Sequence, residues 1–118
     1  MSDSKEETSG SISAGEAIGL AGLVQYGDGA VVSRTLAKGG AGTLTVFAFD
    51  KGQGLSEHSA PFDAYVHILD GEAIVTVGGR PVTARAGDIV LMPADVRHSL
   101  EGAQRFKMLL VMLKHKVG

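Results

Sequence analysis

Two histidines are the residues of this 118-residue chain whose type and position could do chemistry. A neutral imidazole is the commonest side-chain ligand for transition metals, and it also acts as a base near neutral pH. His58 comes shortly after a glycine turn at residues 52–54, and His98 follows Pro93 by five residues. Both stand just after turns, where the strands of a barrel can direct side chains inward. We expect these two imidazoles, forty residues apart in the chain, to meet inside a closed all-β shell.

The other two histidines are expected to be structural. His67 lies in an apolar stretch and has the opposite parity to position 58, so we expect it to be packed, at a subunit interface for example, rather than to bind a ligand. His115 lies in the basic end of the chain, residues 114–118, and is expected to be solvated. The chain has no cysteine, which excludes disulfides, thiolate metal sites and a cysteine nucleophile.

Short strands are the elements that must position the histidine pair. From residue 29 onward the apolar pattern has a period of two, and it is broken by many of the 17 glycines. A two-residue hairpin is expected at Gly78 and Gly79. Glycines 15, 19 and 22 allow at most a helical turn before residue 25. About eight strands at this spacing predict a β-sandwich or barrel; the clearest are residues 30–36, 43–49, 64–69, 72–77, 81–85, 89–92 and 105–113.

The last of these strands is apolar on both faces and must be covered on both sides. We expect a homodimer, in which a second copy covers part of it. The residues expected to form the core or line the barrel are Phe47, Phe49, Val66, Ile68, Leu91, Met92 and Met108.

Length and composition predict one domain, over residues 12–118, after a disordered polar tail at 1–11. The net charge of -2 argues against nucleic acid as a partner. The longest apolar run, residues 108–113, is too short to span a membrane. A cytoplasmic protein is therefore expected.

The glycine, proline and histidine spacings resemble the two signature motifs of the cupin superfamily. The first motif reads G-x5-H-x-H-x3,4-E-x6-G, and here Gly52, His58 and Gly71 occupy three of its positions. The second reads G-x5-P-x-G-x2-H-x3-N, and here Gly87 and His98 match with Pro93 between them. The resemblance covers about residues 43–113 and implies a double-stranded β-helix, the jelly-roll barrel of the cupins.

In the family, three histidines and a glutamate of these motifs form a metal site. Here the second histidine position is Ala60 and the glutamate position is Ala64, so only His58 and His98 remain. Two histidines are fewer than the three protein ligands of a catalytic zinc. Three arrangements would still hold a divalent Zn, Fe, Mn or Ni ion: a bulge that brings in Asp63 or Glu57, a register shift that brings in His67, or water at the open positions.

Three kinds of function follow from these residues. The first is a barrel that binds a small molecule, with His58 and His98 as hydrogen-bonding partners. The second is a metal-dependent cupin enzyme, such as an oxygenase, isomerase or decarboxylase, with the same histidines as ligands. The third is a non-catalytic homodimeric sensor or interaction domain. We expect the first of the three, and the second and third are its alternatives.

Overall fold

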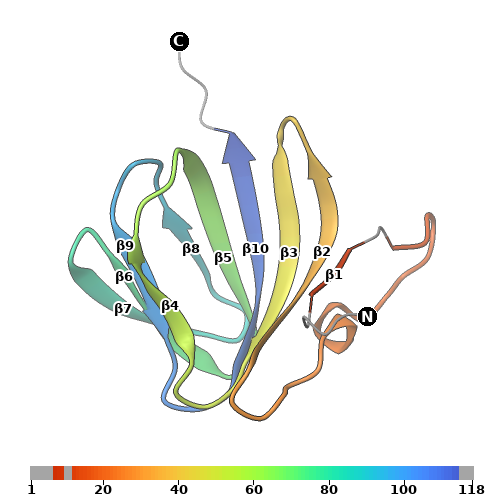
Figure 1. Cartoon of the computed structure of the whole chain (residues 1–118), viewed down its shortest axis with the longest axis horizontal. Coiled ribbons are helices and arrows are strands. Elements are labelled where there is room, and N and C mark those ends of the chain that lie inside the picture. Colours follow the sequence, from red (N-terminus) through yellow and green to blue (C-terminus); the bar gives the residue numbers. More distant parts are fainter. Residues whose placement is uncertain (1–6, 10–11, 115–118) are drawn as a thin grey trace.

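Two facing β-sheets contain most of the described chain, which comprises residues 7–9 and 12–114 of this computed structural model (Figure 1). The larger sheet has six strands, in the order β1 (Glu7–Ser9), β2 (Val31–Gly39), β3 (Gly42–Phe49), β10 (Phe106–Lys114), β5 (Phe62–Asp70) and β8 (Ile89–Met92). The smaller has four, in the order β4 (Gly54–His58), β9 (His98–Glu101), β6 (Glu72–Val77) and β7 (Arg80–Arg85). Strands distant in sequence are thus neighbours, as in a jelly roll.

The Gly78–Gly79 turn joins β6 to β7 as the sequence predicts. Val77 pairs with Arg80 across the two-residue loop, and both glycines have positive φ, 57° and 82°. These backbone angles are those of a type I′ turn, whose twist matches the twist of the strands that it joins. On its other edge β6 pairs with β9, the strand that carries His98.

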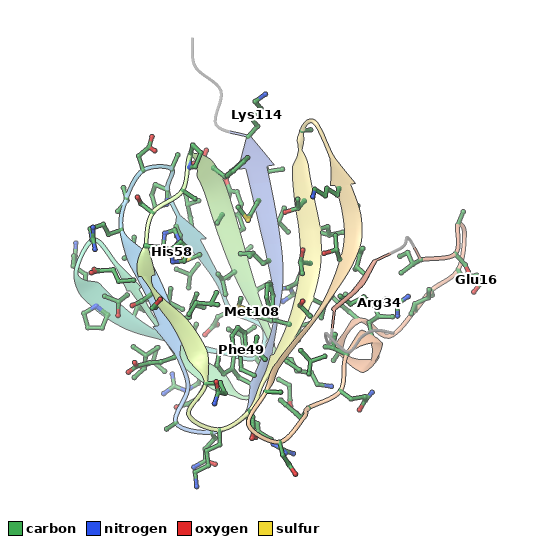
Figure 2. The ribbon with its side chains drawn as sticks, viewed as in Figure 1. Glu16, Arg34, Phe49, His58, Met108 and Lys114 are labelled. Atoms are coloured by element: carbon green, nitrogen blue, oxygen red, sulfur yellow. The ribbon has the colours of Figure 1, made fainter. Side chains whose placement is uncertain are left out.

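The main core lies between the sheets and comes from side chains that alternate along the strands. On β5, Ala64, Val66 and Ile68 are buried, because residues two apart in a strand share a face. Figure 2 shows Phe49 and Met108 between the sheets, with His58 above them toward the end of the barrel where β10 finishes. The rings of Phe49 and Phe106 stack with their centroids 4.4 Å apart.

Most of the residues expected in the core or lining are there. Phe49, Val66, Ile68, Met92 and Met108 are buried, and Phe47 packs against them. Leu91 is the exception, and its assignment was wrong: it is 45% exposed on the outer face of the large sheet. Met92 next to it points into the barrel, so strand alternation turns Leu91 outward.

The outer face of the large sheet is partly covered by the chain itself. A 3-10 helix, η1 (Leu20–Leu23), packs there against a second cluster that includes Val46, Ala48 and Leu109. The Lys107 ammonium donates to the Ala21 carbonyl at 2.7 Å, and Tyr26 donates to Asp70. Burial first, and then this bond to Asp70, raise the pKa of Tyr26. The apolar outer face of β10 thus has a partial cover within its own chain.

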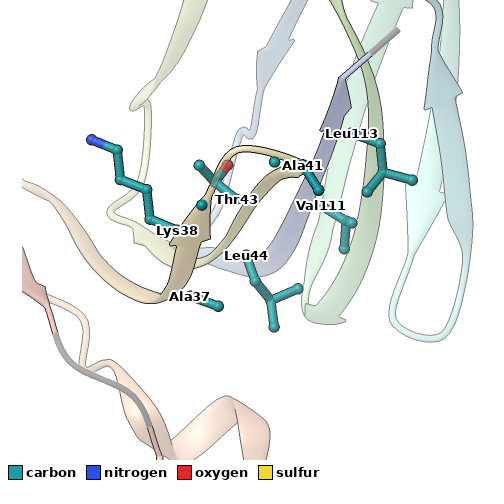
Figure 3. Close-up of a pocket in the computed structure, with 9 residues that line it drawn as sticks. Ala37, Lys38, Ala41, Thr43, Leu44, Val111 and Leu113 are labelled. Atoms are coloured by element: carbon teal, nitrogen blue, oxygen red, sulfur yellow. The ribbon is translucent and has the colours of Figure 1, made fainter. Parts of the chain in front are cut away.

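The rest of this outer face is open. An apolar groove of about 400 Å³ lies where the β2–β3 hairpin meets the end of β10 (Figure 3). It is lined by Ala37, Lys38, Gly39, Ala41, Gly42, Thr43, Leu44, Val111 and Leu113. Ile89, Leu91 and Leu113 are also exposed on this side.

None of the helices in the described part of the chain is long and apolar enough to cross a membrane.

All seven strands named from the sequence are present, with ends that differ by up to three residues. The helical turn before residue 25 is confirmed as η1. Two further strands, β4 and β9, were not predicted, and they carry the two histidines. Within the segment expected to be a disordered tail, residues 7–9 form β1, which pairs in parallel with β2. The remainder of that segment, and His115, lie outside the described residues.

Candidate functional site

Strands β4 and β9 bring the two histidines together. The strands are antiparallel, and His58 lies opposite His98 in their register. The register shifts between Leu55 and His58, which marks a bulge in β4. At the other end of the pairing, β4 approaches β9 so closely that a Cβ on Gly54 would lie 2.2 Å from the Leu100 carbonyl oxygen. The glycine therefore permits the pairing that aligns the histidines.

The imidazoles face each other through their Nε2 atoms, which are 3.2 Å apart. The rings meet edge to face, with centroids 4.5 Å apart and an interplanar angle of 75°. Their Nδ1 atoms face backbone carbonyls two residues earlier in the chain, at 2.8 Å from Ser56 for His58 and at 3.0 Å from Val96 for His98. His98 is only 3% exposed, whereas His58 is exposed at the mouth of the barrel. The predicted meeting of the two rings is confirmed.

This arrangement needs one more positive charge than two neutral rings provide. Each of the three contacts needs one hydrogen, because a carbonyl oxygen only accepts and two bare nitrogens repel each other. Two neutral imidazoles carry two N–H hydrogens in total. If both Nδ1 atoms donate to their carbonyls, the two Nε2 lone pairs face each other at 3.2 Å. A third proton, or a metal cation between the Nε2 atoms, satisfies every contact.

A second extra charge on the pair is disfavoured. Burial first, and then the charge on His58, lower the pKa of His98, whereas its bond to the Val96 carbonyl raises it. The interior around His98 is apolar, so a second proton would be poorly solvated there. The pair therefore suits one added cation.

A row of side chains on the large sheet faces the histidine pair. Ala64 on β5 pairs with Met92 on β8 and with Met112 on β10, so these three residues form one row across the sheet. The row and the histidines border the same small cavity, of about 40 Å³. Its lining comprises Leu55, His58, Ala60, Ala64, Met92, His98, Leu100, Leu110 and Met112.

The residues considered as further metal ligands point elsewhere. Glu57 is at the surface, where it pairs with Arg97 at 3.1 Å. Asp63 accepts a hydrogen bond from the backbone N–H of Ala94 at 2.9 Å. His67 has the opposite parity to the buried residues of β5 and pairs with Leu109 without a register shift, so it faces away from the barrel interior. No group of three histidine, cysteine or acidic side chains able to hold a metal occurs within 7–9 and 12–114.

Sequence reasoning did not predict that two methionines line this cavity. Met92 was among the expected core residues, and Met112 was not singled out. Their meeting at Ala64 depends on the pairing of β5 with both β8 and β10, and those partners are far apart in the chain. Inward parity was the only signal that the sequence contained.

Solved structures support the same architecture. A conserved Streptococcus pyogenes protein of unknown function is 35% identical, with a TM-score of 0.84 over 90% of this chain and 93% of that one. A Leptotrichia buccalis cupin 2 conserved barrel domain protein is 39% identical, with a TM-score of 0.77 over 80% of this chain and 46% of that one. A Desulfitobacterium hafniense cupin superfamily protein is 29% identical, with a TM-score of 0.83 over 88% of this chain and 95% of that one.

No curated protein sequence matches the chain significantly. The family model described as "Cupin domain" matches residues 45–112, which is more than half of the chain. This match spans both histidines and the row at Ala64, and it agrees with the two-sheet architecture described above. The chain therefore belongs to the cupin family.

Proposed function

We propose that this protein binds one metal cation between His58 and His98, and that a small ligand reaches that cation from the mouth of the barrel. The observation that carries the proposal is the set of three contacts around the imidazole pair, which two neutral rings cannot satisfy. A cation between the Nε2 atoms removes the repulsion. It also lets both Nδ1 atoms keep their bonds to the backbone.

The distances fit a shared ion. Metal–nitrogen bonds to histidine are about 2.0–2.1 Å long. The two Nε2 atoms are 3.2 Å apart, so both imidazoles could hold one ion at such a distance. Bonds from the second ring nitrogen to a carbonyl are also what orients histidine ligands in metal sites.

The pair does not complete a metal site by itself. It provides two nitrogen ligands, and no carboxylate of the described residues joins them. The remaining positions on the ion would be available to further donors, either from the chain or from a small ligand. When bound, a metal can polarise a coordinated oxygen as a Lewis acid. The residues of this chain would orient the ion, with His98 fixed in the interior and His58 at the entrance.

The small cavity favours an ion over a sizeable organic ligand. Its volume is about 40 Å³, whereas pockets that enclose drug-sized ligands measure roughly 300–1,000 Å³. The space suits an ion with a few ligand atoms. A larger molecule would have to bind over the mouth, beside the exposed His58.

Metal retention by matched histidine variants tests the proposal. The purified chain is stripped with a chelator, incubated separately with Cu(I), Zn(II), Mn(II), Fe(II) and Ni(II), dialysed and analysed for metal. We expect at least one cation to be retained at one equivalent per chain. His58→Ala and His98→Ala should abolish retention. His67→Ala is the matched control, because His67 lies outside the barrel, and it should retain the metal.

Nitrogen NMR of the histidine rings provides a second readout, which does not depend on the choice of metal. In the metal-loaded protein, both Nδ1 atoms should carry a proton and neither Nε2 atom should carry one. Failure of the wild-type chain to retain any of the five cations would overturn the proposal. Retention by both single-histidine variants would also overturn it.

A further inference from the structure

We infer that the cation is soft, namely Cu(I), and that the thioethers of Met92 and Met112 bind it together with the two histidines. This inference rests on the proposed function, since it takes the cation to lie between His58 and His98. It goes further by assigning two more ligands and the identity of the metal. The argument comes from the strand register, the lining of the cavity and the charge that this lining can tolerate.

The strand register places the two methionines on either side of a gap. Met92 and Met112 are the cross-strand partners of Ala64, one on each neighbouring strand. Neighbouring strands lie about 4.8 Å apart, so both side chains flank the short alanine on the inner face. Alanine leaves open the space that a longer side chain would fill. Methionine has three rotatable bonds and a polarisable sulfur, so two methionines can share that space.

The histidines border the same cavity from the other sheet. The cavity lining therefore contains two imidazoles and two thioethers, and its remaining members are alanines and leucines. Met92 is only 2% exposed, and Met112 is partly buried against the core. Thioether sulfur selects soft ions such as Cu(I), whereas Mg(II) and Mn(II) prefer oxygen ligands. Imidazole binds copper well, so all four donors suit this ion.

Charge favours the same ion. The solvation cost of burying a charge in an apolar interior is large, and in a continuum it grows with the square of the charge. No carboxylate among the described residues is placed to neutralise a divalent ion here. Four neutral ligands around Cu(I) leave a single positive charge within this apolar lining. A divalent ion would leave two.

A matched set of methionine variants tests the inference. Met92→Leu and Met112→Leu remove sulfur but nearly preserve volume, a change that cores usually tolerate. Met108→Leu is the control, because Met108 is buried in the same barrel but does not line the cavity. Cu(I) affinity is measured without oxygen, by competition with the chelator bicinchoninate. We expect each cavity variant to lose more than about tenfold in affinity, since even groups that only orient ligands contribute 10–100-fold. The control should be unchanged.

X-ray absorption by the copper-loaded wild-type protein gives a readout that needs no variant. It should show both nitrogen and sulfur neighbours of copper, and the sulfur signal should weaken in Met92→Leu. A spectrum without sulfur would overturn the inference, as would leucine variants that bind Cu(I) as tightly as the wild type. In both cases retention of a cation by the histidines would leave the proposed function standing. If the wild-type chain retains no metal at all, the proposed function fails as well.

Discussion

Restoring a carboxylate at position 64 should convert this site into one for a harder ion. Ala64 is 4% exposed and borders the same cavity as His58 and His98. Ala64→Glu would add a carboxylate oxygen to two imidazoles, the combination that non-haem iron sites use. The variant should therefore bind Mn(II) or Fe(II) more tightly than the wild type. It should bind Cu(I) less tightly, because the new side chain separates the two methionines.

The size of the effect follows from the burial of position 64. Without metal, overpacking a cavity of about 40 Å³ should cost about 1–3 kcal/mol. That corresponds to roughly 4–12 °C in melting temperature for a chain of this size. At a free Mn(II) concentration of about 100 times Kd, binding should return about 2.7 kcal/mol. The variant should then melt about 10 °C higher with Mn(II) than without it.

The assay is thermal unfolding followed by circular dichroism, with chelator and with Mn(II). Ala64→Gln is the control, because glutamine has nearly the same size but carries no charge. It should lose about 1–3 kcal/mol to overpacking, without the further cost of a buried charge, and it should gain little from Mn(II). The same metal response in Ala64→Glu and Ala64→Gln would refute the reasoning, because the geometry would then not place residue 64 beside the ion.

Three further predictions concern the ion pair between Asp50 and Arg105, the pairing of β4 with β9, and the open outer face. The hydrogen bond from Arg105 is the main cause that lowers the pKa of Asp50 from 3.8 to about 2. The stabilisation that this bond provides is therefore complete above pH 3.8 and is lost as the pH falls through about 2. An acid titration of Asp50→Asn should lack this step. Gly54→Ala forces a Cβ against backbone and should cost about 1–3 kcal/mol or more in urea unfolding, and it should weaken metal binding. Gly39→Ala, where the added Cβ has no neighbour within 4 Å, should have a small effect on both. Light scattering at micromolar concentration should give the mass of a dimer for the wild type. Ile89→Lys, on the exposed outer face, should give the mass of a monomer. A monomeric wild type would contradict the expected homodimer.

Local pattern was sufficient to predict the long strands of this protein. The alternation in residues 64–69 matches the buried and half-buried faces of β5, because a period of two reflects strand geometry alone. It was insufficient for β4 and β9, of only five and four residues, which lack a long alternating run. The same rule explains the error at Leu91, whose neighbour Met92 took the inward position. A run of four apolar residues does not indicate which parity faces the core.

The spacing of glycine, proline and histidine indicated from the sequence alone that His58 and His98 would meet, because turns at those positions fix where each strand begins. The sequence also determined that the usual third and fourth ligand positions are alanines. Only the tertiary structure decided that Glu57 and Asp63 are occupied elsewhere and that Met92 and Met112 flank Ala64. The physical reason is that hydrogen bonding between strands far apart in the chain sets which side chains become neighbours. The strand register and the packing of one sheet against the other are properties of the whole barrel and not of any local segment.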